Sequence, residues 1–146
     1  MSSPYTIDNE GIGSGPFLTM SIDATADKDF CQDDIDDNLT ACVISDDNEV
    51  GMGAAGDKLF GKVVWVSTDF VEGTTRPSTC AVQARGVARF VYAATTPVIN
   101  QMVEVDGAGK IRQAAADVDI AAGGHLMRGQ VIAVDTVNNT CDVWLG

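Results

Sequence analysis

The sequence has very little histidine and no long apolar run, and each shortage excludes a class of function. His125 is the sole histidine among 146 residues, so a Ser–His–Asp or Cys–His site would have to use it as its base. It follows Gly123 and Gly124, a context that favours a surface or turn histidine. No stretch approaches the roughly 20 apolar residues of a membrane span. We therefore expect neither an enzyme of this kind nor a membrane protein.

Metal-binding and phosphate-binding motifs are also missing. The cysteines contain no C-x-x-C pair, and the aspartate run at 33–37 is not followed by the glycine and glutamate pattern of an EF-hand loop. The glycines of residues 11–15 lead into Pro16 and not into a helix, as a phosphate site would require. We predict no metal, no cofactor and unpaired, buried thiols. The cysteines are Cys31, Cys42, Cys80 and Cys141.

Basic residues are nearly absent from the first two-fifths of the chain. Residues 1–57 hold 13 acidic side chains and one basic residue, Lys28, whereas residues 58–146 hold eight of each sign. The whole net charge of −12 therefore lies in the first segment. Such a surface disfavours nucleic acid as a direct partner. It either keeps the protein soluble as a solvated face or docks a basic partner. The first 20 residues also lack a secretory signal.

The distribution of glycine, proline and β-branched residues predicts an extended arm followed by one β domain. Residues 1–16 are rich in Gly, Ser and Pro and form the arm, and residues 17–146 form the domain. A loop is expected over 23–38, and a helix of one or two turns only within 113–122. Short apolar runs between turn residues predict the strands. They cover 17–22, 40–45, 62–67, 79–85, 87–92, 101–105, 128–134 and 140–145.

Two of these strands begin after a glycine and are continuously apolar. Residues 63–66 read V-V-W-V after Gly61, and residues 131–134 read V-I-A-V after Gly129. A continuous apolar run of this length is typical of a strand buried on both faces. Residues 106–109 read D-G-A-G between apolar residues, which predicts a hairpin connection.

The most informative feature is an internal repeat. Residues 61–67 (GKVVWVS) parallel residues 129–135 (GQVIAVD), and the motif T-C-x-V occurs at both Thr79 and Thr140. We assign repeat one to about residues 40–86 and repeat two to about 101–146. A single copy has one apolar face and unpaired edges, so two copies are expected to bury these faces together. The predicted fold is therefore mainly β, a compact barrel-like or β-tulip domain built from two degenerate repeats.

Four stretches resemble the small decoration, or cement, proteins that stud the heads of tailed phages. They are AAGDKLFGKVVWVS at 54–67, CAVQARGVARFVY at 80–92, MVEVDGAGKI at 102–111 and GQVIAVDTVNNTCDVWLG at 129–146. The proteins of this family are similar to the chain because they also have a G-x-V-x-x-V strand, then a V-x-V-x-G-x-A strand, then a V-x-x-D-x-x-G-K hairpin. The resemblance covers about residues 40–146, and the acidic first 39 residues lie outside it.

The resemblance implies a structural role on a virion. Decoration proteins are compact β folds, often trimeric, that sit at three-fold or quasi-three-fold positions on the outer surface of the capsid. The implied function is to bind a phage head made in the host cytoplasm and to clamp neighbouring capsomers. The implied partners are the major capsid protein and further copies in a homotrimer. The N-terminal arm would pair with a capsid loop, with Tyr5, Ile7 and Ile12 filling shallow pockets.

Four further side chains are candidates for contacts between subunits. Trp65 and Trp144 lie in the matching strands, where burial in the interior is the expectation and a subunit contact is the alternative. Arg85 and Arg89 flank Gly86 and either contact another subunit or the shell or are simply solvated. A second function remains open from another class: a carbohydrate- or host-surface-binding β module of a virion or tail fibre. An exposed aromatic platform would favour it.

Overall fold

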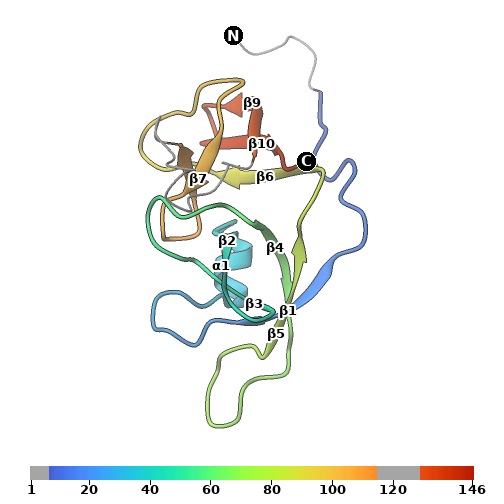
Figure 1. The fold of residues 1–146 in the computed structure, drawn as a ribbon, viewed down its shortest axis with the longest axis vertical. Helices are drawn as coiled ribbons and strands as arrows, with labels where there is room; N and C mark the ends of the chain where they lie inside the picture. Colours follow the sequence, from blue (N-terminus) through green and yellow to red (C-terminus); the bar gives the residue numbers. More distant parts are fainter. Residues whose placement is uncertain (1–6, 115–128) are drawn as a thin grey trace, which may run out of the picture.

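The computed structural model describes residues 7–114 and 129–146 and contains ten short strands and one helix. Strands are joined by turns, and the fold is mainly β, as predicted (Figure 1). The first five strands are β1 (Leu18–Ile22), β2 (Ala41–Asp46), β3 (Glu49–Gly51), β4 (Gly61–Val66) and β5 (Thr79–Gln83). The second five are β6 (Val87–Val91), β7 (Val103–Val105), β8 (Ile111–Gln113), β9 (Gln130–Asp135) and β10 (Thr140–Trp144). The helix α1 spans Gln32–Asp36.

The first five strands close into a barrel in the order β1-β3-β2-β4-β5. Strand β4 lies between β2 and β5 and pairs antiparallel with both. Strand β1 pairs antiparallel with β5 and parallel with β3. Gly61 opens β4 because a Cβ at this position would collide with the carbonyl oxygen of Gln83 on the neighbouring strand. The close approach of two backbones thus explains the glycine that leads the apolar run.

The second five strands repeat the same set of pairings. Strands β6, β10 and β9 form one sheet and β7 and β8 form another. The two sheets are joined by a parallel bridge between Tyr92 and Ile111 and an antiparallel bridge between Met102 and Gln130. These bridges place β6 beside β8 and β7 beside β9, as β1 lies beside β3 and β2 beside β4. We refer to residues 18–83 as the first half and to residues 87–144 as the second half.

The register of the two long hairpins is the same in both halves. Val63 pairs with Val82 in β4–β5, and Val131 pairs with Val143 in β9–β10. Each hairpin has a register shift just after this pair, and each then pairs a residue with a buried cysteine, Cys80 or Cys141. The matching units begin at β1 and β6, so they are longer than the segments 40–86 and 101–146 that the T-C-x-V motifs delimit.

The halves have separate hydrophobic cores that share one wall. One cluster is built mainly from the first half and the other mainly from the second. Strand β2 contributes to both, because Cys42 packs in the first cluster while Ala41 and Val43 pack in the second. The alternation of side chains along a strand sends neighbouring residues to opposite faces. The first three residues of β2, Ala41–Val43, are therefore buried on both sides and connect the two cores.

Three expectations about local structure need correction or lie outside the described residues. The runs at 63–66 and 131–134 are not buried on both faces, since Trp65 is 53% exposed and Ile132 is 40% exposed. Each hairpin faces a core on one side and solvent on the other. Residues 23–38 contain α1 and are not all loop. The helix was expected within 113–122, but only residues 113 and 114 of this range are described, and Gln113 belongs to β8. The rest of the range lies outside the described residues.

No helix within residues 7–114 and 129–146 has the length and apolar character needed to cross a lipid bilayer.

Candidate functional site

Both tryptophans present their rings to solvent. Trp65 on β4 is 53% exposed and Trp144 on β10 is 45% exposed, so the expectation that both pack in the interior is wrong. Trp65 lies at the register shift of its hairpin, between the buried residues Val63 and Val66, and its side chain faces outward. A Cβ at Gly13 would lie 3.9 Å from the Trp144 ring, so the N-terminal segment passes beside this side chain.

Arg89 is the centre of an ion network on the outer face of the second half. Its Nε donates to Oδ1 of Asp142 at 2.8 Å, and its two terminal nitrogens donate to Glu10 at 2.8 Å and Asp8 at 3.0 Å. Lys62 lies 3.5 Å from the other oxygen of Glu10. A guanidinium can bind several carboxylate oxygens at once because its five donors lie in one plane. Arg89 therefore ties the N-terminal segment to the β-sheet.

The charges in this network affect one another's protonation. A backbone hydrogen bond from Glu10 and the nearby Arg89 lower the pKa of Asp8. The hydrogen bonds that Arg89 donates to Asp142 raise the pKa of Arg89 above its already high ordinary value. Burial lowers the pKa of Lys62, and the carboxylate of Glu10 opposes this shift. Both shifts at Asp8 and Arg89 favour the charged form, so this ion pair is present at neutral pH.

Residues 11 and 12 also pair with the sheet through their backbone. Gly11 N–H donates to the carbonyl oxygen of Val87 at 2.9 Å, and Val87 N–H donates to the carbonyl oxygen of Ile12 at 2.9 Å. The segment therefore lies along the free edge of β6. Of the predicted arm residues, Ile7 is 69% exposed and Ile12 is 59% exposed, and Tyr5 lies outside the described residues. Arg85 packs along Gly15, where a Cβ would come within 2.9 Å of its Cδ.

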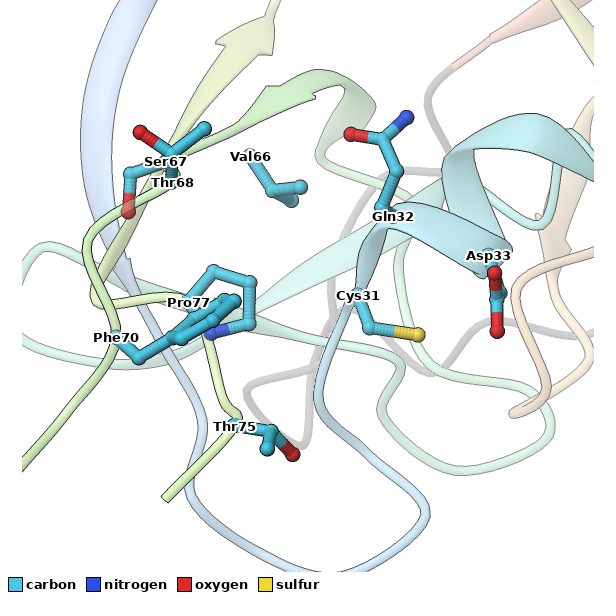
Figure 2. Close-up of a pocket in the computed structure, with 9 residues that line it drawn as sticks. All are labelled: Cys31, Gln32, Asp33, Val66, Ser67, Thr68, Phe70, Thr75 and Pro77. Carbon is cyan, nitrogen blue, oxygen red and sulfur yellow. The ribbon is translucent and has the colours of Figure 1, made fainter. Parts of the chain in front are cut away.

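A separate open pocket of about 440 Å³ lies at the far end of the first half, between α1 and the loop that joins β4 to β5. Phe70 and Pro77 pair through an antiparallel bridge on one side of the pocket, and Cys31 and Gln32 lie on the other side (Figure 2). Phe70 is 56% exposed. Hydroxyl, amide and carboxylate groups complete the lining. They belong to Gln32, Asp33, Ser67, Thr68 and Thr75.

The thiols are poorly suited to act as nucleophiles. All four cysteines are free, as expected from the sequence. Burial raises the pKa of Cys80 and of Cys141 to about 12, and partial burial also raises the pKa of Cys31, whose Sγ lies 3.1 Å from Asp34. A thiol is reactive as its thiolate. Cys80 and Cys141 are therefore protonated at neutral pH and behave as small apolar side chains.

Among the described residues, no group of three or more histidine, cysteine, aspartate or glutamate side chains could hold a metal ion. His125 lies outside this part of the chain.

One polar pair was not predicted from the sequence. Glu104 is only 2% exposed, and its carboxylate lies 2.6 Å from the guanidinium of Arg112 across the β7–β8 hairpin. The signal was present, since a hairpin turn at 106–109 places residue 104 opposite residue 112. What the pattern did not indicate is that Glu104 is buried while the side chain of Arg112 remains 43% exposed, and that Gly56 of the first half lies near both side chains.

Comparisons with known proteins return no match for the chain, whether against family models, curated proteins or solved structures.

Proposed function

We propose that the chain is a structural capsid decoration protein. It binds the outer surface of a tailed-phage head, made in the host cytoplasm, and clamps neighbouring capsomers. Its partner is the major capsid protein, and it acts as a homotrimer without enzymatic activity. The proposal rests on the four sequence stretches that resemble decoration proteins and on the surface of the fold described here.

The observation that carries the proposal is the pair of half-exposed tryptophans on the hairpins of two rigid β units. Trp65 and Trp144 are 53% and 45% exposed in the single chain. Because tryptophan is strongly favoured at the centres of protein interfaces, these two side chains mark a surface for a partner. Each ring stands on a strand whose other face is anchored in a packed core. A side chain held in this way loses little conformational freedom on binding, so more of its contact energy contributes to affinity. The fold thus supplies two preorganised contact points.

A binder of this kind stabilises a shell by mass action. If it binds only the expanded shell, it lowers the free energy of that state by an amount that grows with the ratio of free binder to Kd. The clamp needs rigidity and contacts with neighbouring capsomers, and it needs no reactive group.

Co-sedimentation with heads of the phage that encodes the chain tests the proposal. We expect the wild-type protein to pellet with expanded heads and to remain in solution with unexpanded ones. Trp65→Ala or Trp144→Ala should weaken binding by about 30-fold, the effect of losing an interface residue worth about 2 kcal/mol. Phe70→Ala is the matched control, because Phe70 is an aromatic residue of similar exposure that lines the pocket between α1 and the β4–β5 loop. Failure of the wild-type protein to pellet with either form of head would overturn the proposal.

A second candidate function, carbohydrate or host-surface binding, is favoured by the pocket beside Phe70. An exposed aromatic ring surrounded by hydroxyl, amide and carboxylate groups suits a sugar, which has apolar C–H faces and a polar rim. Glycan-array binding that Phe70→Ala abolishes and Trp65→Ala leaves intact would support this function. An array without signal for the wild-type protein would exclude it for the glycans tested.

A further inference from the structure

The two halves differ at one equivalent place, the outer edge of their first strand. In the second half this edge belongs to β6, and residues 11 and 12 pair with Val87 through two backbone hydrogen bonds. In the first half the corresponding strand is β1. Leu18 pairs with Val82 as Ala88 pairs with Val143, so Phe17 corresponds to Val87 and Thr19 to Arg89.

The backbone of Phe17 and Thr19 points away from the barrel. In an antiparallel pair, alternate residues direct their N–H and C=O groups to the partner strand and to the opposite side. Ser21 N–H donates to the carbonyl oxygen of Asn48 on the side away from β5, so residues 19 and 17 on the same strand face this side as well. Strand β3 covers the edge only at Ser21 and Ile22. Within residues 7–114 and 129–146, no backbone hydrogen bond is made on this side at residues 17 or 19.

The same short edge exposes apolar side chains. Phe17 is 50% exposed and Leu18 is 46% exposed, and β1 lies at the margin of the fold (Figure 1). An exposed strand edge with unpaired backbone groups is a template for another extended segment. The second half shows that this geometry accepts such a segment, because its equivalent edge already carries one.

Charge decides what kind of segment fits. The acidic segment at 8–10 suits the second half because Arg89 lies beneath it, whereas the first half has the neutral Thr19 at that position. Next to the strand, Glu49 pairs with Ser21 and Asp23 follows Ile22, while Arg76 donates to the carbonyl oxygen of Ile22 at 3.1 Å and Arg85 lies along Gly15. The first half as a whole is acidic, because residues 18–83 hold 13 acidic and four basic side chains. Lys28 is the sole basic residue among residues 1–57. A second copy of the chain's own acidic segment would be repelled here, and a basic one attracted.

We propose that the β1 edge at residues 17–19 binds an extended, basic segment of a partner protein by strand addition. The backbone of Phe17 and Thr19 pairs with the segment, Phe17 packs against its apolar side chains, and the net negative charge of the first half attracts its lysine or arginine residues. The binding mode is independent of the proposed function. Only the identification of the partner as the major capsid protein rests on it.

An NMR titration of the intact chain tests this site directly. The probe is an eight-residue peptide of alternating valine and lysine, and its control is the same peptide with glutamate for lysine. We expect shifts of the backbone amide signals at residues 17–21 with the lysine peptide, weakening as salt is added, and none with the glutamate peptide. Thr19→Pro removes the outward N–H and should weaken binding at least about tenfold. Thr19→Val keeps the backbone donor and should bind like the wild type.

The outcomes separate the site from the proposed function. Shifts elsewhere on the surface, no shifts in the wild-type protein, or equal binding of Thr19→Pro and Thr19→Val would overturn the strand-addition site. The amide signals of Cys80 and Val82, opposite β1, report whether the proline variant keeps its fold, and the wild-type shift map decides the question if it does not. Co-sedimentation of the wild-type protein with heads decides the proposed function separately, whatever the peptide result.

Discussion

At the residue scale, three cysteines occupy positions that a valine or alanine could fill. Cys42, Cys80 and Cys141 are at most 1% exposed. Cys80 and Cys141 lie at equivalent positions in the two hairpins, one in each core. The alternation of T-C-x-V predicted that these side chains face inward, and this is confirmed. A cysteine side chain is small and apolar, so it packs between valines, and its S–H group is only a weak hydrogen-bond donor that does not need a strong acceptor.

Burial makes a prediction about the chemistry of these thiols. Because the pKa values of Cys80 and Cys141 are raised to about 12, both are protonated at pH 8 in the folded protein. We expect them to react with a thiol reagent at the rate of unfolding, whereas Cys31, which is partly exposed, reacts first. Mass spectrometry of the modified protein with and without denaturant measures this order. Rapid modification of Cys80 in the native protein would contradict it.

Adjacent residues on β9 provide a matched test of which face is buried. Val131 is 1% exposed and Ile132 is 40% exposed. Val131→Asp places an unpaired charge in the core and should lower the free energy of unfolding by more than about 4 kcal/mol, a large part of the stability of an ordinary domain. Ile132→Asp puts the same charge into solvent and should change the free energy of unfolding by less than about 1 kcal/mol. Urea unfolding followed by circular dichroism compares them, and equal losses would refute the assigned faces.

At the element scale, α1 shows why a helix was missed. Its sequence, Gln32–Asp36, has no apolar periodicity and contains no buried residue. The helix is held locally, because Asp34 accepts a hydrogen bond from the backbone N–H of Cys31 at 3.0 Å and two aspartates lie in its first turn. Negative charge near a helix N-terminus is favourable. In the sequence these aspartates indicate a loop just as well, so their pattern alone does not separate the two.

The N-terminal segment is a second element whose placement depends on charge. Asp8→Asn combined with Glu10→Gln removes both carboxylates that Arg89 binds from this segment but leaves the Arg89–Asp142 pair intact. We expect the amide hydrogen of Gly11 to exchange roughly two- to fivefold faster, as suits the loss of weak exposed ion pairs. Asp69→Asn combined with Glu72→Gln makes the same change of two charges on exposed residues of the loop that joins β4 to β5, and it is the control. Hydrogen exchange followed by NMR measures both, and unchanged exchange in the double variant would contradict the anchoring role.

Acid should release the same segment. The pKa of Asp8 is lowered in the folded protein, so its contact with Arg89 contributes above the ordinary aspartate pKa of 3.8 and is lost as the pH falls through the lowered value. We expect Gly11 exchange, corrected for its intrinsic pH dependence, to rise only at acidic pH. The double variant should not show this rise, and a rise of equal size in that variant would contradict the assignment.

At the scale of the whole molecule, the shared strand β2 makes the halves interdependent. Ala41 and Val43 pack in the core of the second half while Cys42 packs in the core of the first. Losing either core would expose one face of β2. We therefore expect a single cooperative unfolding transition although the fold contains two sets of five strands.

Two core variants test this coupling. Val63→Ala and Val131→Ala each remove methyl groups from a different core and should cost roughly 1–3 kcal/mol. Both should lower one common Tm, by roughly 3 °C per kcal/mol. Differential scanning calorimetry is the measurement. Two separated transitions, with each variant shifting only one of them, would show that the halves unfold independently.

Most strands and the existence of a repeat were determined by the sequence itself, whereas the short strands β3 and β8, the bounds of the repeat and the exposure of the two tryptophans were not. The period-2 alternation around Cys80 and Cys141 and the glycines at 61 and 129 are local features, and they predicted where these strands lie and that the two cysteines face inward. Gln83 reads as a solvent-facing residue, yet it is 4% exposed because its amide donates to the carbonyl oxygens of Arg85 and Val87 where the halves meet. Trp65 reads as a core residue and faces solvent. Backbone preference depends on neighbours along the chain, whereas burial depends on surfaces that distant segments bring, so only the tertiary structure decided which edges and rings remain available for a partner.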